Sequence, residues 1–73
     1  MASRRSLQAQ LGKRIREVRR DRDLSQMDLV RQADWSLSHY QKLERGVLDP
    51  RLSTLKKLAD SFGVSLSKLL EDV

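Results

Sequence analysis

The sequence predicts an all-α fold of five short helices, because helical periodicity runs through the chain and capping residues punctuate it. Five runs repeat apolar residues every three or four positions, and a serine precedes each run, where its oxygen accepts a free backbone N–H. These serines are Ser6, Ser25, Ser36, Ser53 and Ser65. Gly46 and Gly63 follow two of the runs, as glycines do where helices end. No stretch alternates apolar and polar residues over the length of a strand.

The first expected helix ends near Arg22 and is strongly basic on its outer side. Its apolar side is formed by Leu7, Leu11, Ile15 and Val18. Residues 1–22 contain eight Lys/Arg and two Asp/Glu, whereas the rest of the chain contains seven and eight. The net charge of +5 and the pI of about 10.2 favour a polyanionic partner. The alternative is ordinary surface charge on a helical protein.

The second and third expected helices, 26–33 and 37–45, lie unusually close along the chain. Ser25 and Asp28 have the spacing of a capping box at the start of the second helix. Only residues 34–36 separate the two helices, which is too few for an antiparallel hairpin and is typical of a helix-turn-helix. We expect Ala33 and Trp35 to fill the corner between them.

The third helix has two different sides. Tyr40 and Leu43 lie on the inner side with Glu44 beside them. The outer side carries a row of hydrogen-bond donors with two positive charges, formed by Ser38, Gln41, Lys42 and Arg45. The alternative is that this side is an ordinary solvated helix face without a binding role.

Two further helices complete the expected fold. The apolar positions of the fourth are Leu55, Leu58, Ala59 and Phe62. The apolar positions of the short fifth helix are Leu66, Leu69, Leu70 and Val73. The 73 residues suffice for one small domain, so we expect a single domain over residues 1–73.

Composition argues against several functional classes. The chain has no cysteine and one histidine, which argues against a structural zinc site, and we expect no metal or cofactor. It has no evident catalytic carboxylate pair or phosphate-binding glycine loop, so we expect no enzyme and no catalytic residues. No apolar run approaches the ~20 residues of a membrane span, and the N-terminus is not a secretory signal. We therefore expect a cytoplasmic protein without a membrane partner.

Residues 11–70 resemble the lambda-repressor-like helix-turn-helix domain, also called the XRE family. The resemblance is carried by the order and spacing of "LSQMDLV" (24–30), "KLERG" (42–46), "LKKLADSFGVS" (55–65) and "LSKLL" (66–70). It implies that the protein binds double-stranded DNA and regulates transcription, with the third helix as the recognition helix. Asp23 and Asp34 depart from the pattern, because they stand where relatives commonly have glycine at left-handed turns.

The resemblance also implies roles for individual residues. Base reading is expected from Leu37, Ser38, Gln41 and Lys42, although Leu37 is equally well read as a packing residue. Phosphate contacts are expected from Gln26, Ser36, His39, Arg45, Arg51 and Ser53. Arg4 and Arg5 are candidates for an arm along the DNA, whereas Arg14, Arg16 and Arg20 are equally well a solvated face. An ion pair is expected between Arg19 and Glu44.

One such domain contacts too few bases for useful specificity, so we expect a homodimer on a palindromic operator. Its interface is expected on the fifth helix at Leu66, Leu69, Leu70 and Val73, where the first two also complete the core. The length resembles that of a stand-alone controller protein of a restriction–modification system, with RNA polymerase as a further candidate partner. Alternatives are a phage-type repressor or an antitoxin subunit and, in another class, a protein-interaction module on the same fold.

Overall fold

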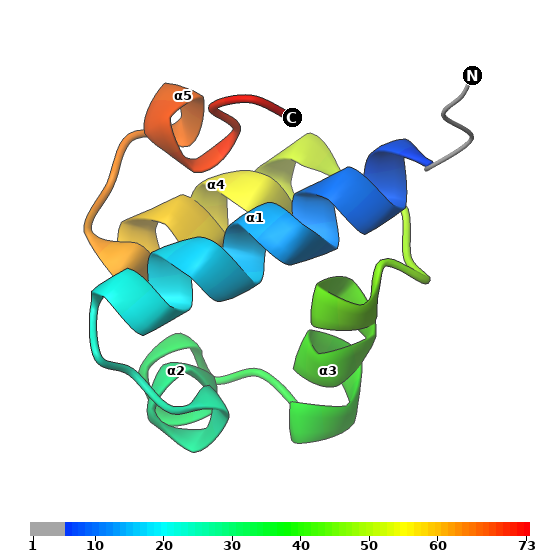
Figure 1. Cartoon of the computed structure of the whole chain (residues 1–73). Helices are drawn as coiled ribbons and strands as arrows, with labels where there is room; N and C mark the ends of the chain where they lie inside the picture. Colours follow the sequence, from blue (N-terminus) through cyan, green and yellow to red (C-terminus); the bar gives the residue numbers. More distant parts are fainter. Residues whose placement is uncertain (1–5) are drawn as a thin grey trace.

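A computed structural model describes residues 6–73, and this part of the chain is all helical. The five helices are α1 (Leu7–Asp21), α2 (Gln26–Ala33), α3 (Leu37–Arg45), α4 (Leu52–Phe62) and α5 (Leu66–Leu69). Helix α1 packs against α3 and α5, while α4 packs against α2 and α5. In Figure 1, α2 and α3 lie on one side of α1, and α5 lies on the opposite side with the C-terminus. The predicted fold class is therefore confirmed.

Four of the five expected serine caps are present. The side chains of Ser6, Ser25, Ser36 and Ser65 each accept a hydrogen bond from the backbone N–H three residues later. The expectation for Ser53 is wrong, because α4 already begins at Leu52. Its N-cap is Arg51, which makes no capping hydrogen bond through its side chain.

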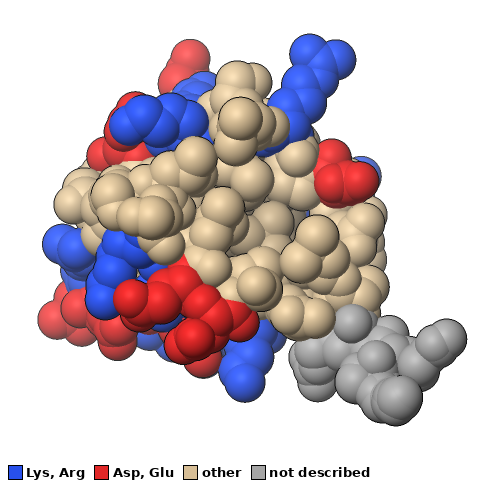
Figure 2. Space-filling model, turned by 90° about the horizontal axis from the view of Figure 1, so that it is seen from above, with Lys and Arg blue, Asp and Glu red and all other residues tan. Residues whose placement is uncertain are grey.

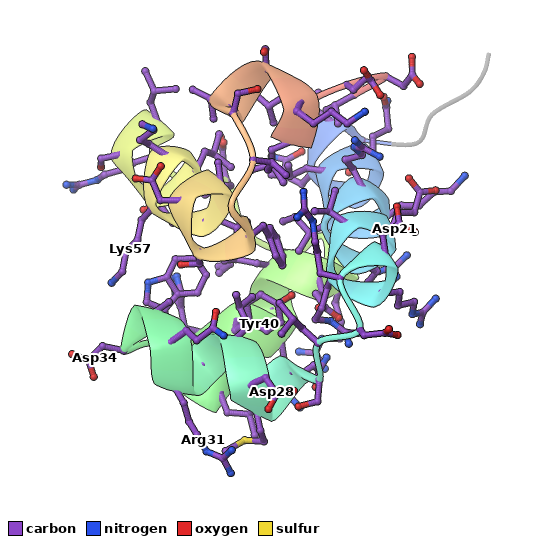
Figure 3. All side chains as sticks on the ribbon, turned by 90° about the vertical axis from the view of Figure 1, so that its left-hand side faces the viewer. Asp21, Asp28, Arg31, Asp34, Tyr40 and Lys57 are labelled. Carbon is purple, nitrogen blue, oxygen red and sulfur yellow. The ribbon has the colours of Figure 1, made fainter. Side chains whose placement is uncertain are left out.

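The core lies where the helices meet, and all five contribute to it. Its largest fully buried side chains are Ile15, Leu29, Tyr40, Leu43, Leu58 and Leu69. In Figure 3, Tyr40 points into the centre of the molecule, whereas Asp28 and Asp34 point outward. The assignment of Leu7 to the buried side of α1 is wrong, because this residue is 64% exposed.

Two glycines allow α1 and α3 to approach each other closely. A Cβ atom added to Gly12 would lie 2.5 Å from the carbonyl oxygen of Glu44. Gly46 has a φ of 75°, and a Cβ atom there would lie 2.6 Å from Cα of Ala9. Any larger residue would push the helices apart, so these glycines determine how α3 is held against α1.

The turns after α1 and α2 use aspartates in the left-handed conformation. Asp23 and Asp34 both have a φ of 56°, which aspartate tolerates better than most residues but less well than glycine.

The fifth helix is shorter than expected. It ends at Leu69, so that Val73 lies beyond it and donates its N–H to the carbonyl of Leu70.

None of the helices in residues 6–73 has the length and apolar character needed to cross a membrane. Within the same range, no group of three or more His, Cys, Asp or Glu side chains is arranged to hold a metal ion.

Candidate nucleic-acid interface

The local sequence determines where α2 and α3 begin and end. Ser25 Oγ accepts from the N–H of Asp28 at 3.0 Å, and Asp28 Oδ2 accepts from the N–H of Ser25 at 2.9 Å. The hydrogen bond from the Ser25 N–H is the main cause that lowers the pKa of the Asp28 carboxyl. Ser36 then caps α3, and Gly46 ends it in the left-handed conformation. Both helices are thus capped at their N-termini, and α3 is also capped at its C-terminus.

The outer side of α3 is exposed, whereas its inner side is buried. Tyr40, Leu43 and Glu44 are buried and attach the helix to the core. The four donor-bearing residues face solvent, and they are Ser38, Gln41, Lys42 and Arg45. Leu37 is half-buried, so it is neither a core residue nor fully exposed to solvent. The helix therefore presents a row of exposed hydrogen-bond donors to solvent.

The predicted ion pair between Arg19 and Glu44 is present, and it anchors α3 to α1. Arg19 Nε lies 2.6 Å from Glu44 Oε2, and Arg19 Nη2 lies 3.3 Å from Oε1. Arg19 also donates to the carbonyl of Leu24 at 2.9 Å, which connects the pair to the turn before α2. The bidentate geometry and the burial of both side chains set this pair apart from the exposed pairs on the surface.

Hydrogen bonds decide the ionisation state of Glu44. Burial opposes its charge, but hydrogen bonds from Arg19 and Gln26 outweigh burial, and the pKa of the carboxyl lies below its usual value. The Tyr40 hydroxyl lies near Glu44 and Arg19, yet it makes no hydrogen bond of regular geometry within residues 6–73. We therefore assign the stabilisation mainly to Arg19 and Gln26. Burial in turn raises the pKa of Tyr40.

Gln26 connects the ion pair to the exposed side of α3. Its Nε2 donates to Glu44 Oε1 at 2.9 Å, and its Oε1 accepts from Gln41 Nε2 at 3.2 Å. Gln26 stands at the first position of α2, where backbone N–H groups have no partner inside the helix. The expected phosphate ligand is therefore also a link between the core and a candidate base-reading residue.

The other candidate phosphate ligands lie at the two ends of α3 and at the start of α4. Ser36 and His39 are exposed at the start of α3, and Arg45 is exposed in its last turn. Arg51 and Ser53 are exposed at the start of α4. Arg4 and Arg5 lie outside the described residues.

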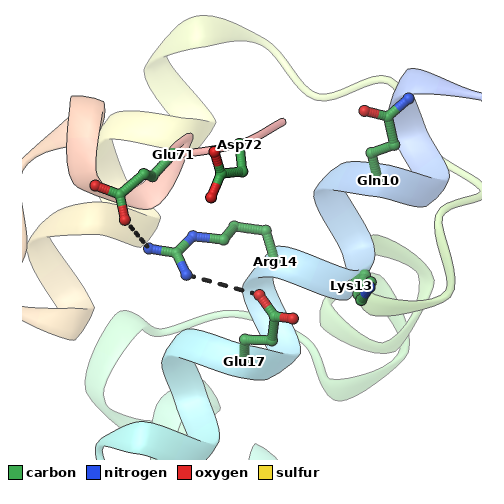
Figure 4. Close-up of a pocket in the computed structure, with 6 residues that line it drawn as sticks. All are labelled: Gln10, Lys13, Arg14, Glu17, Glu71 and Asp72. Atoms are coloured by element: carbon green, nitrogen blue, oxygen red, sulfur yellow. Dashed lines mark ion pairs between the residues drawn. The ribbon is translucent and has the colours of Figure 1, made fainter.

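Two arginines of α1 have structural partners that the sequence did not reveal. Arg14 donates to the carbonyls of Lys68 and Leu69, and it lies between Glu17 and Glu71 (Figure 4). Arg16 donates to the main-chain carbonyl of Glu44. A purely solvated face is therefore wrong for both, because each holds another helix against α1. Apart from Glu17, the partners lie 28 or more residues away, so helical periodicity within α1 contains no signal for them.

Ala33 and Trp35 fill the corner between α2 and α3, as expected. Ala33 is buried, and Trp35 is partly buried against the core. The Trp35 ring lies 6.0 Å from the rings of both His39 and Tyr40. Lys57 reaches from α4 and places its ammonium 5.4 Å from the centre of the Trp35 ring (Figure 3). This cation–π contact, which sequence reasoning missed, attaches the turn to α4.

The residues expected at a dimer interface divide between core and surface. Leu69 is fully buried, whereas Leu66, Leu70 and Val73 are only partly buried. The expectation that Leu66 completes the core is thus met only in part. Leu70 and Val73 line an open groove of about 280 Å³. Its other lining residues are Leu7, Gln8, Leu11, Asp49, Pro50 and Leu55.

Comparisons with known proteins agree with this architecture. A family model described as a helix-turn-helix domain matches residues 10–71. The chain is 40% identical over 63 residues to the HTH-type transcriptional regulator DdrOP3 of Deinococcus deserti, covering 86% of this chain and 49% of that protein. It is 35% identical over 60 residues to the immunity repressor protein of Bacillus phage phi105, covering 82% of this chain and 42% of that protein. The chain thus spans about half the length of these curated relatives.

Among solved structures, the chain is similar to the restriction-modification controller protein C.AhdI from Aeromonas hydrophila. The TM-score is 0.80 at 29% sequence identity, and the match covers 85% of this chain and 94% of that chain.

Proposed function

This chain belongs to the helix-turn-helix domain family, and on that premise we propose that it is a sequence-specific, double-stranded-DNA-binding regulator of transcription. The observation that carries the proposal is the two-sided character of α3. Its inner side is buried and pinned by the Arg19–Glu44 ion pair, while its outer side offers a row of exposed donors. A B-DNA major groove is about 12 Å wide and admits one helix with its donors at the height of the base edges.

In this proposal, α3 lies in the major groove and reads bases through four residues. Lys42, in the middle of the helix, favours guanine, whose edge presents two acceptors. Gln41 suits adenine, Ser38 accepts several bases, and Leu37 contacts a thymine methyl group. Gln26, Ser36, His39, Arg45, Arg51 and Ser53 surround the helix and contact the phosphates on either side.

We further propose that the protein acts as a homodimer through the groove beside α5. The groove is lined mainly by aliphatic side chains, and one of them, Leu7, is a large apolar residue that is 64% exposed. Seen from the side of α5, the centre of the surface carries few charges and the charged residues lie around its edge (Figure 2). Burial of such a surface favours association, and two copies would then read half-sites about 34–36 Å apart.

Within this class, we favour a restriction–modification controller over a phage-type repressor or an antitoxin. Similarity to C.AhdI over 94% of that structure supports the first choice. Similarity to the phi105 immunity repressor supports the second. In the controller role, RNA polymerase would be a further partner. The rival from another class is a protein-interaction module, which has no need of exposed donors at Ser38 and Lys42.

The deciding experiment is selection of operators from a random duplex library, followed by titration of the selected duplex at several salt concentrations. A DNA-binding regulator should enrich a palindromic sequence and lose affinity steeply as salt rises, because bound counterions are released. Failure to enrich any sequence, together with binding that salt leaves unchanged, would contradict DNA recognition and favour the protein-interaction module.

A further inference from the structure

A pocket between α1, α2 and α3 is surrounded by positively charged side chains. This pocket has a volume of about 370 Å³ and is lined by Arg16, Arg19, Arg20, Gln26, Gln41, Glu44 and Arg45. Four arginine charges and one glutamate charge leave a net charge of +3 around it. A water molecule occupies about 30 Å³ in the liquid, so the pocket has room for a phosphate group together with some of its water.

The arginines around this pocket differ in whether their charge is paired with a carboxylate. Arg19 is committed to Glu44 by its two contacts with the carboxylate. Arg16 donates to a main-chain carbonyl but forms no ion pair within residues 6–73. Arg20 and Arg45 are exposed and form no ion pair within the same range. Three guanidinium groups therefore remain without a carboxylate, although Glu17 and Asp21 occur on the same helix as two of them.

The helices arrange these three groups around one opening. Arg16 and Arg20 are one turn apart on α1, and Gln41 and Arg45 are one turn apart on α3. Glu44 and Gln26 lie between the two pairs and are hydrogen-bonded to each other. Because the hydrogen bond to the Glu44 carbonyl anchors Arg16, part of its donor fork is oriented before any ligand arrives. Planar guanidinium forks match the oxygen atoms of a phosphate better than ammonium groups do.

We infer that this pocket is a phosphate-binding site and that α1, through Arg16 and Arg20, is part of the surface that holds DNA. The inference rests on the proposed function. It names as phosphate ligands two arginines for which the sequence left a solvated face equally plausible. Gln41 and Arg45 belong both to the pocket and to the exposed row of α3, so a backbone phosphate bordering the groove reaches the pocket when α3 is in place.

The test measures duplex binding by fluorescence anisotropy with a random-sequence duplex between 50 and 200 mM NaCl. Arg20→Gln should lower the slope of log affinity against log salt by about one, and the variant should lose about 3.5-fold less affinity over this range. Arg20→Lys, which keeps the charge, should retain the slope. The matched control is Lys13→Gln on the same helix, since Lys13 lines a different pocket with Glu17, Glu71 and Asp72 (Figure 4). It should leave the slope unchanged.

Arginine Nε–H signals in NMR spectra separate the two sources of phosphate. Shifts of the Arg16, Arg20 and Arg45 signals on adding the duplex alone assign the site to backbone phosphate. Shifts with both the duplex and inorganic phosphate, at constant ionic strength, show a site that also accepts the free anion. Either pattern supports the inference. If the wild type binds duplex but Arg20→Gln and Lys13→Gln behave alike and the Arg20 signal does not move, the inference is overturned. If the wild type shows no salt-dependent duplex binding, the proposed function itself fails.

Discussion

Removing Arg19 should be among the most damaging single changes in this protein, because it leaves a carboxylate buried without its cation. The side chains of Arg19 and Glu44 are only 12% and 4% exposed. Breaking such a buried pair from one side costs about 3–5 kcal/mol. A domain of this size has a free energy of unfolding of about 4–11 kcal/mol, so Arg19→Met removes a large part of it.

The assay is urea unfolding followed by circular dichroism at pH 7. With a slope of about 1 kcal/mol per molar urea, the midpoint of Arg19→Met should fall by about 3–5 M, or the variant should be unfolded without urea. The matched control is Lys56→Met, which breaks the pair between Lys56 and Asp60 on α4. That pair is 60% and 61% exposed, so its loss should cost under about 1 kcal/mol.

The pH dependence of this penalty tests its cause. In the wild type the pKa of Glu44 is lowered, so its contribution to stability is complete at neutral pH and is lost as pH falls through the folded-state pKa. In Arg19→Met, burial should instead raise the pKa of Glu44, and protonation should relieve the strain. The stability gap between the two proteins should therefore narrow from pH 7 toward pH 4. A loss below about 1 kcal/mol at pH 7, or a gap that pH leaves unchanged, would refute this reasoning.

Three further predictions concern recognition, assembly and backbone strain. Lys42→Ala should lower the binding free energy for the selected operator by about 1–3 kcal/mol and that for random duplex much less. Gln26→Ala should instead weaken binding to both duplexes by a similar factor. Titration of each variant with both duplexes tests this, and equal losses for Lys42→Ala would show that Lys42 is a phosphate ligand. Leu70→Glu should leave a folded protein that sediments as a monomer and binds the operator weakly, while a wild type that is monomeric at high concentration yet binds tightly would contradict the dimer. Asp34→Gly should stabilise the fold by about 1 kcal/mol and raise Tm by about 4–8 °C, because glycine adopts the left-handed conformation without steric cost; a lower Tm would contradict it.

The helices could be predicted from sequence because local rules govern them. The spacing of Leu29 and Ala33, the Ser25–Asp28 capping box and the three-residue turn before α3 all act within a few residues of one another. These features place α2 and α3 to the residue. Ser53 misled the prediction because a serine one position inside a helix looks, in sequence, like a serine that caps it. The same pattern placed Leu7 in the core, although too few neighbours reach the first turn of α1 to cover it.

Local patterns in the sequence predict the five helices, the two-sided character of α3 and, through the family resemblance, the pairing of Arg19 with Glu44. The roles of the α1 arginines depend on packing instead, because Arg14 has its partners on α5 and Arg16 has its partner on α3. Helical spacing places Arg16 and Arg20 on one side of α1 and Arg14 on another, but it does not show what faces them. Packing turns Arg14 toward the end of α5 and brings Arg16 and Arg20 to the pocket beside Gln26 and Arg45. Arginines of one helix thus acquire different tasks, because the helices that approach them differ.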